Sequence, residues 1–327
     1  MNNQRRALQL SIVFSFFNEE DVIPTLVQRT RAVMAEAFQK GFIRGYELIF
    51  VNDASRDNSA AALLKLAEEK KDIRIINMSR SFGVAPCVLA GLAYSKGEAV
   101  VYMDADLQDP PEVILKMLDN YINDPLVEVV HTLRTDRKGE SRFKLFLTSV
   151  GYNILNRYSS VSIPKNVGDF KLISRRVVDH ILQFKENKPF MRGLIAWVGF
   201  KQNFIPYTRE ARFAGKSKFL VLGEKVISNF FNAAIVNFSS VPLQIASYCG
   251  LFAIILDFLV IFHALYEKLS GRAIPGWTAL MIIILFIGGV QLFCLGMIGL
   301  YLQSVHDQTK MRPGYIVDST YGFETTT

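Results

Sequence analysis

The chain has 327 residues, of which 50% are hydrophobic and 20% charged, and its mean hydropathy is +0.21. This composition excludes a disordered, collagen-like or all-polar protein. Residues 1–238 carry 33 basic and 25 acidic side chains, whereas residues 239–327 carry 4 and 5, so the net positive charge belongs to the first part of the chain. Three cysteines at unrelated spacings argue against a disulfide framework or a zinc site and favour a reducing compartment.

Short apolar runs alternate with amphipathic stretches over residues 8–135. The runs typical of strands are LQLSIVFSF, YELIFV, IRIINM, EAVVYM and VEVVHT, and the segments between them have ordinary helix lengths. This alternation predicts an α/β domain with a mostly parallel sheet. Ligands of such sheets collect at the carboxyl ends of the strands, so the polar residues that follow each run form the candidate site.

Asp104 and Asp106 flank a single residue at the end of the fourth run. This spacing lets both carboxylates approach one hard divalent cation and leaves positions open for phosphate oxygens or water. Helix capping ahead of Pro110 is the alternative interpretation. Acidic or amide groups also follow the first two runs. The sequence contains no Gly-x-Gly-x-x-Gly or Walker pattern, which argues against a dehydrogenase and against an ATPase.

Two apolar runs near the carboxyl end are long enough to cross a bilayer as helices. Val241–Tyr266 contains one formal charge, Asp257, and Trp277–Gln303 contains none. We therefore predict two transmembrane helices at about 241–266 and 277–303, against the alternative of two buried soluble helices. Glycines in the second run allow close helix contact, which favours a homo-oligomer over a transport pathway.

Basic residues on the domain side of both runs predict the orientation in the membrane. Lys218 and Lys225 precede the first run, and Lys310 and Arg312 follow the second, which places the large domain and both termini in the cytoplasm of a multi-pass membrane protein. Basic and apolar residues mix over 216–238, as in a helix that lies in the headgroup layer, with a plain linker helix as the alternative. The predicted units are a cytoplasmic α/β domain at 1–208, a basic loop and interfacial helix at 209–240, the two spans within 241–303, and a cytoplasmic tail at 304–327.

A resemblance to a known family covers nearly the whole chain. The segments SIVFSFFNEED, FVNDASRDNS, SRSFGVAPCVLAGLAYSKGEAVVYMDADLQDPPEVI, GDFKLISR and RFAGKSKF, in this order before two spans, closely resemble the membrane-anchored polyprenyl-phosphate glycosyltransferases. These are family 2 glycosyltransferases of GT-A fold, and they include dolichol-phosphate mannose synthases and bactoprenol glucosyltransferases. The resemblance implies an inverting glycosyltransferase that uses a divalent metal, Mg²⁺ or Mn²⁺.

The resemblance also implies roles for individual residues. The implied donor-binding residues are Phe17, Glu19, Asp53, Arg80, Gly83, Asp104, Ala105, Asp106 and Gln108. Asp104 and Asp106 are the implied metal ligands, and Asp169 matches an acidic residue near the acceptor, where we expect it to position the sugar or a cation, with a base role open. The implied catalytic residues are Asp104, Asp106, Asp169, Arg212 and Lys218. The chain departs from the family pattern at Ser15, Asn52 and Ser81, where proline, aspartate and asparagine are common.

Cationic side chains are needed to orient the acceptor, because a phosphate monoester with a second pKa of about 6 is largely a dianion at neutral pH and needs no strong base. Two basic clusters, one around residues 134–144 and one at 209–218, provide them. We expect the acceptor phosphate to contact Arg134, Arg137, Arg212, Ser217 and Lys218. The other basic residues of the two clusters are assigned to anionic lipid headgroups.

The predicted reaction is transfer of glucose from UDP-glucose to undecaprenyl phosphate at the cytoplasmic face of the membrane. The same reaction with GDP-mannose or with a modified UDP-pentose is the alternative within this class. A non-catalytic membrane scaffold is a distant alternative, and a flippase role is disfavoured because two spans offer little material for a polar path. A separate flippase is an expected partner class, whereas nucleic acid is not expected as a partner.

Overall fold

The computed structural model describes residues 5–135, 167–186, 189–210, 241–270 and 276–323. The chain divides into two compact units. Within the described ranges, an α/β unit contains the residues up to 210 together with 313–323, and a helical unit contains residues 241–312. Each unit is described by itself below.

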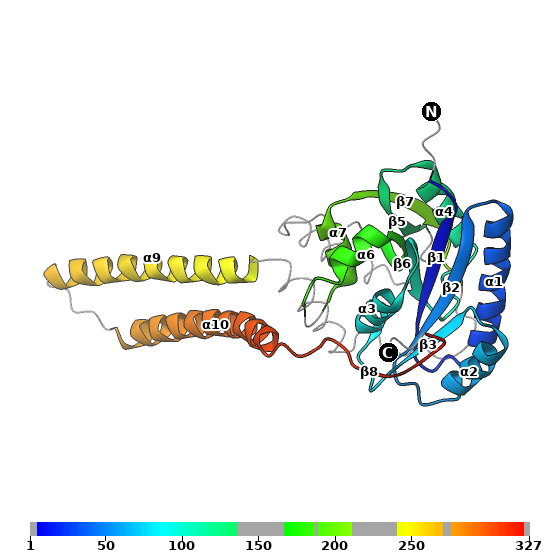
Figure 1. Ribbon diagram of the computed structural model, residues 1–327. Coiled ribbons are helices and arrows are strands. Elements are labelled where there is room, and N and C mark those ends of the chain that lie inside the picture. Colours follow the sequence, from blue (N-terminus) through cyan, green and yellow to red (C-terminus); the bar gives the residue numbers. More distant parts are fainter. Residues whose placement is uncertain (1–4, 136–166, 187–188, 211–240, 271–275, 324–327) are drawn as a thin grey trace. The chain divides into compact units, whose positions relative to one another are not determined.

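The first half of the α/β unit is a parallel sheet whose strands alternate with helices (Figure 1). Strand β1 lies between β4 and β2, and β3 follows β2. These elements are β1 (Leu8–Phe16), α1 (Ile23–Gln39), β2 (Ile43–Asn52), α2 (Ser59–Glu69), β3 (Ile73–Met78), α3 (Val84–Tyr94) and β4 (Ala99–Asp104). All four strands coincide with predicted apolar runs, which confirms the α/β class and the mostly parallel sheet.

The second half of the α/β unit extends this sheet at both edges, giving the order β7-β5-β6-β4-β1-β2-β3-β8. Strand β6 is antiparallel to β4 and β5, and β8 is antiparallel to β3. These elements are α4 (Val113–Asn123), β5 (Val127–Arg134), β6 (Val167–Ser174), α6 (Arg175–Ile181), α7 (Met191–Val198), β7 (Lys201–Tyr207) and β8 (Val317–Tyr321).

The central strands are apolar on both faces because helices cover both sides of the sheet. Figure 1 shows α1 and α2 on one side and α3 and α6 on the other. All residues of β1 except Gln9 are buried, and Phe14 stacks on Phe50 of β2 with ring centroids 4.7 Å apart. Such two-sided burial explains why the strands read as nearly continuous apolar runs in the sequence.

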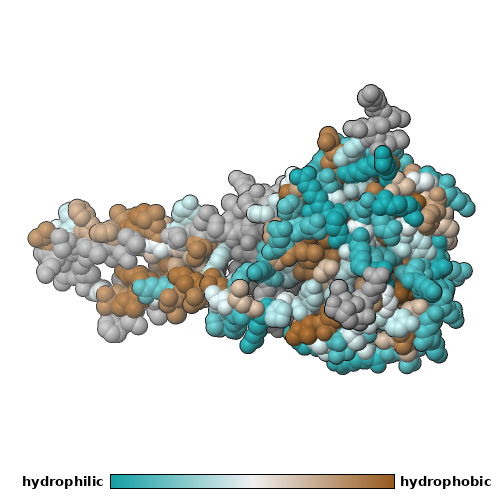
Figure 2. All heavy atoms as spheres, in the orientation of Figure 1, coloured by the Kyte–Doolittle hydropathy of each residue, from teal (hydrophilic) through white to brown (hydrophobic). Residues whose placement is uncertain are grey.

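The helical unit contains α9 (Val241–Leu269) and α10 (Trp277–Thr309), which begin at the residues predicted for the two spans. The Cys294 thiol of α10 lies 3.1 Å from the carbonyl oxygen of Ala246 in α9. Phe262 is 77% exposed and Leu292 is 72% exposed, and hydrophobic side chains gather over both helices in Figure 2. By length and composition, one stretch of the described residues, Phe286–Thr309, qualifies to cross a membrane. The two-span hairpin therefore stays a prediction.

The segment predicted as a cytoplasmic tail, 304–327, contains the end of a helix and a strand. Helix α10 continues to Thr309, and residues 317–321 form β8 at the edge of the α/β sheet. The strand was not predicted because VDSTY is short and mostly polar, and its side chains are largely exposed, as suits an edge strand.

Gly91 allows α3 to approach the sheet closely, and this contact fixes where the helix begins. A Cβ at this position would lie 2.2 Å from Cγ1 of Val13 and 3.2 Å from Cγ2 of Val51. Both valines are fully buried strand residues. A side chain at position 91 would therefore force α3 and these strands apart.

We expect Gly91→Val to destabilise the α/β unit by about 1–3 kcal/mol, because a buried valine cannot move aside without distorting the strand. The exposed Ala93 on the same helix provides a control, since Ala93→Val places the same valine side chain where it faces solvent. Thermal unfolding of the full chain in detergent should show a lower midpoint for Gly91→Val alone. Equal midpoints for the two variants would contradict the close contact.

Candidate active site

The loops that follow the carboxyl ends of the parallel strands carry a strained backbone. Asn18, Ala54 and Leu107 have φ values of 53°, 58° and 56°, and they lie in the loops after β1, β2 and β4. Non-glycine residues adopt this left-handed region at a cost, and such strain concentrates at functional sites. The polar residues predicted from the sequence also lie at these carboxyl ends of the strands.

Hydrogen bonds tie the loop after β1 to the loop after β2. The backbone N–H of Asn18 donates to Oγ of Ser55 over 3.0 Å, and the N–H of Arg56 donates to Oδ1 of Asn18 over 2.7 Å. The backbone N–H of Glu19 donates to Oγ of Ser59 over 2.8 Å. These contacts make the two loops one structural piece, and they place Glu19 in a buried position at the sheet edge.

The Asp53 carboxylate organises the loop between β3 and α3. It accepts hydrogen bonds from Oγ of Ser81 over 2.8 Å, from the N–H of Phe82 over 2.7 Å, and from the N–H of Gly83 over 3.1 Å. Gly83 has a φ of 95° and precedes the first turn of α3, where a negative charge is favourable. Arg80 is exposed and its guanidinium lies 4.0 Å from the centroid of the Phe82 ring. Asp53 thus acts on the predicted donor residues Arg80 and Gly83 through their loop.

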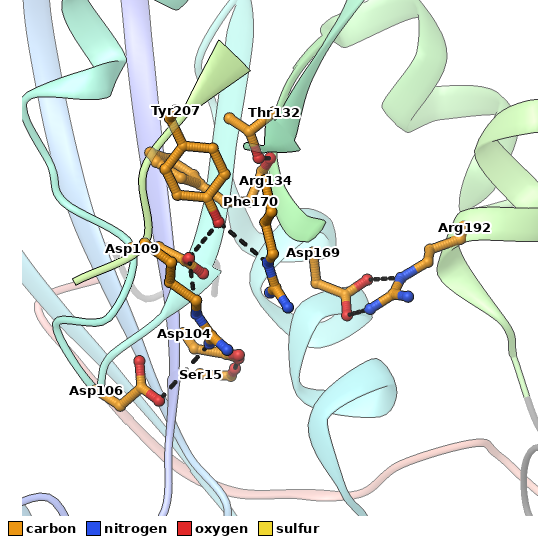
Figure 3. Close-up of polar contacts among 11 residues, drawn as sticks. Ser15, Asp104, Asp106, Asp109, Thr132, Arg134, Asp169, Phe170, Arg192 and Tyr207 are labelled. Carbon is orange, nitrogen blue, oxygen red and sulfur yellow. Dashed lines mark hydrogen bonds and ion pairs between the residues drawn. The ribbon is translucent and has the colours of Figure 1, made fainter. Parts of the chain in front are cut away.

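Asp104 and Asp106 lie at the carboxyl end of β4, as predicted (Figure 3). Oγ of Ser15 donates to Oδ1 of Asp104 over 3.2 Å, and the N–H of Gln108 donates to Oδ1 of Asp106 over 3.1 Å. Burial, together with the negative charges of Asp106, Asp169 and Asp109, raises the pKa of Asp104 to about 7. Burial is the largest cause of this shift, and the neighbouring carboxylates add to it.

A second network approaches this loop from β5 and β7. The Tyr207 hydroxyl donates to Oδ1 of Asp109, and Nε of Arg134 donates to the Tyr207 hydroxyl over 3.2 Å. Nε of Arg209 donates to the same Asp109 oxygen over 3.2 Å, and its Nη2 lies 4.0 Å from Oδ2 of Asp106. Arg209, which the sequence analysis assigned to lipid headgroups, is thereby shown to be a partner of these carboxylates.

Asp169 on β6 forms a two-point ion pair with Arg192 of α7 (Figure 3). Nε of Arg192 lies 2.9 Å from Oδ1 of Asp169, and Nη2 lies 2.5 Å from Oδ2. Burial alone would raise the pKa of Asp169, but the positive charges of Arg192, Lys171 and Arg134 outweigh burial and hold the pKa well below its usual range. A carboxylate with so low a pKa is a weak proton acceptor near neutral pH, so the geometry favours the positioning role over the base role.

The arrangement fits a divalent cation that is shared with a substrate. Within the described ranges, no group of three or more His, Cys, Asp or Glu side chains is arranged to hold a metal ion. Two carboxylates are nevertheless sufficient for Mg²⁺ or a similar ion, because such ions commonly complete their shell with phosphate oxygens and water. Asp104 and Asp106, at the carboxyl end of β4, could supply these two carboxylates.

The structure places most of the predicted site residues near the ends of the strands on one side of the site, and four of them lie outside the described residues. The predicted residues found along the ends of β1 to β6 are Phe17, Glu19, Asp53, Arg80, Gly83, Asp104, Ala105, Asp106, Gln108, Arg134 and Asp169. The predicted residues Arg137, Arg212, Ser217 and Lys218 lie outside the described residues.

Three further residues of this network were missed from the sequence. Asp109 follows the Asp104–Gln108 segment directly, so its place beside a predicted metal-binding segment was a usable signal. Arg192 and Tyr207 lie in stretches without a recognisable motif, and only the fold brings them to the site.

Comparisons with known proteins agree with this architecture. The model of the family "Glycosyl transferase family 2" matches residues 11–182. An uncharacterized glycosyltransferase of Bacillus subtilis (strain 168), YkcC, is 41% identical over 98% of this chain and 96% of its own length. The SfII prophage-derived bactoprenol glucosyl transferase of Shigella flexneri is 34% identical over 96% of this chain and 99% of its own length.

Among solved structures, the mannosyltransferase PcManGT from Pyrobaculum calidifontis, in complex with GDP-Man and Mn²⁺, aligns with a TM-score of 0.47 at 16% identity, over 94% of this chain and 90% of that chain. A similarity this low carries no argument about donor or metal. The family match covers more than half of the chain, and the curated relatives match it almost end to end. The chain belongs to glycosyl transferase family 2 and is a glycosyltransferase.

Proposed function

We propose that this glycosyltransferase transfers glucose from UDP-glucose to a polyprenyl phosphate, undecaprenyl phosphate in the first instance, with inversion at the anomeric carbon. The position of Asp104 and Asp106 among further carboxylates at the carboxyl ends of the strands carries the proposal, because carboxylates placed there can hold a divalent cation that is shared with the diphosphate of a nucleotide sugar. Relatives that are named bactoprenol glucosyl transferases support the sugar and the acceptor.

Asp104 and Asp106 would hold Mg²⁺ or Mn²⁺, which supplies positive charge to the leaving nucleoside diphosphate as its bond to the sugar breaks. The chain prepares this pair before the donor arrives. The Ser15 hydroxyl orients Asp104, and the backbone N–H of Gln108 orients Asp106. The Arg209 guanidinium lies 4.0 Å from the Asp106 carboxylate, where its positive charge can offset negative charge that develops on the diphosphate.

The acceptor side needs orientation more than proton removal. A phosphate monoester is largely a dianion at neutral pH and is already a nucleophile. Arg134 uses one of its five N–H donors on Tyr207, and the rest of its guanidinium is suited to a phosphate oxygen. Asp169, kept ionised and fixed by Arg192, would position the sugar or a cation beside it.

Membrane attachment through α9 and α10 completes the proposal. Both helices have large apolar side chains exposed along their length, and the second contains the stretch that qualifies as a span. We place the α/β unit on the cytoplasmic side, because basic residues lie before the first helix and after the second, at the ends that the chain connects to the α/β unit. Such an anchor would keep the enzyme at the surface where a lipid-linked acceptor presents its phosphate.

We expect Asp104→Asn and Asp106→Asn each to lower transfer by about 100-fold or more, because each removes a ligand from a cation worth several kcal/mol of charge stabilisation. Membranes that contain the full chain are incubated with labelled UDP-glucose and undecaprenyl phosphate, and labelled lipid is extracted into organic solvent. The exposed Asp119 on α4 gives a matched control, Asp119→Asn, which should retain wild-type activity. Product that persists in a chelator would contradict the metal role.

A panel of donors tests the identity of the sugar. UDP-glucose should give the highest kcat/KM among UDP-glucose, a UDP-pentose and GDP-mannose, each assayed with the same acceptor and metal. A higher value for GDP-mannose or the pentose would replace glucose while keeping the reaction type. Binding of UDP without turnover of any donor would instead favour a non-catalytic scaffold.

We expect Arg192→Gln to make transfer more sensitive to acid. Without the Arg192 guanidinium, burial is opposed only by Lys171 and Arg134, so the pKa of Asp169 rises, and the carboxylate is protonated and activity lost at a higher pH than in the wild type. Activity recovers as the pH rises because Asp169 is then ionised. The profile of kcat/KM against pH should show this loss in Arg192→Gln and much less of it in Arg192→Lys, which keeps the charge. Superimposable profiles for wild type and Arg192→Gln would refute the positioning role.

A further inference from the structure

The chain returns to the α/β sheet after the helical unit and completes its edge. Strand β8 pairs antiparallel with β3, with Tyr321 opposite Ile75 and Ser319 opposite Asn77. In Figure 1 this strand, drawn in red, lies beside β3. The predicted donor loop follows β3 directly, so the returning segment borders the donor side of the site.

The start of β8 holds the beginning of that donor loop. Val317 is opposite Met78, the last residue of β3. One position further, the backbone N–H of Ser79 donates to the carbonyl oxygen of Ile316 over 3.0 Å. The ladder therefore extends beyond β3 into the loop whose other end, at Gly83, is held by Asp53. The loop is fixed from both sides.

A series of hydrogen bonds, called the relay below, runs from β8 through β3 and β2 to the loop that follows β2. Nδ2 of Asn77 donates to Oγ of Ser319 over 3.1 Å, and Nδ2 of Asn52 donates to Oδ1 of Asn77 over 3.1 Å. Oδ1 of Asn52 in turn accepts from the N–H of Ser55 over 2.9 Å. Since Oγ of Ser55 accepts from the N–H of Asn18, the relay reaches the loops after both β2 and β1.

Asn52 is one of the positions at which this chain departs from the family pattern, where an aspartate is common. The relay explains the asparagine, because its side-chain amide donates one hydrogen bond to Asn77 and accepts another from Ser55. An ionised aspartate accepts only. The departure and the strand β8 thus belong to the same network.

The far end of β8 is fastened by an aromatic contact. The Phe323 ring meets Tyr94, the last residue of α3, edge to face at 5.1 Å, and Arg74 lies 5.4 Å from the Phe323 centroid. Gly322 has a φ of 79°, and a Cβ there would lie 2.9 Å from the carbonyl oxygen of Ile73. These constraints hold β8 in one register.

We propose that residues 313–323 are a positioning element of the donor site, which holds the loop Ser79–Gly83 in the conformation that binds the nucleotide part of the donor. The inference rests on the proposed function for the identity of the ligand, and on β8, Asn77 and Asn52 for the mechanism. A strand that only covers the sheet edge would stabilise the fold without favouring one loop conformation.

The test compares the full chain, a chain that ends after Arg312, and a control chain that ends after Phe323. Backbone hydrogen exchange is measured over residues 79–83, and UDP binding and the kinetics of transfer are measured on the same preparations. Loss of β8 should speed exchange in the loop and raise the KM for the donor about tenfold, with kcat and the KM for the acceptor nearly unchanged. The control chain should match the full chain.

A peptide of residues 313–323, added to the chain that ends after Arg312, should restore slow exchange and the donor KM. The relay is tested by Asn77→Leu, which should raise the donor KM, and by Asn77→Asp, which keeps an acceptor for both Asn52 and Ser319 and should restore it.

Unchanged exchange over 79–83 in the chain without β8 overturns the inference, whatever the ligand. An equal fall of donor binding, acceptor binding and kcat, without rescue by the peptide, also overturns it, because that pattern indicates general misfolding. Failure of the proposed function has a different signature: the full chain would form no labelled lipid from any donor, while the exchange experiment would still report on the loop.

Discussion

Negative charge at the carboxyl edge of the sheet is the constraint that the rest of the site must satisfy. Four aspartates lie around the end of β4: Asp104 is its last residue, Asp106 and Asp109 follow it, and Asp169 lies on the neighbouring β6. Gathering buried carboxylates is unfavourable unless cations offset them. The chain supplies guanidinium groups from β5, from α7 and from the residues after β7, yet Asp104 still has a raised pKa. Burial is the largest cause of that raised pKa and the nearby carboxylates add to it, so a positive charge bound beside Asp104 would lower it.

The scaffold and the loops divide this task. Asp109 follows β4, Arg134 is the last residue of β5, and Tyr207 is the last residue of β7. The order of these strands in the sheet therefore sets how far apart the three side chains lie. The loops after β1, β2 and β4 carry the left-handed residues and are held by hydrogen bonds to one another. Rigid strands therefore position the charged groups, while strained and mutually supported loops form the surface at the carboxyl ends of the strands.

Much of this was readable from the sequence, and the missing part has a physical reason. LQLSIVFSF predicted β1 residue for residue, because a strand buried on both faces is apolar without interruption. Asp104 and Asp106 were found because both lie in one short segment. Arg192 and Tyr207 were not, since their contacts join segments far apart in the chain, and no local pattern marks such a residue. Strand β8 was missed because an exposed edge strand needs little apolar character.

The position of β8 in the chain also sets the order in which the enzyme is completed. A ribosome makes the seven other described strands of the sheet first, then α9 and α10, and β8 last. Domains tend to fold from the amino terminus during synthesis, so the α/β unit can form while the edge of β3 is still unpaired. The last strand is available only once both apolar helices have been translated. Until residues 317–321 have been translated, the edge of β3 is therefore an open template for pairing with another strand.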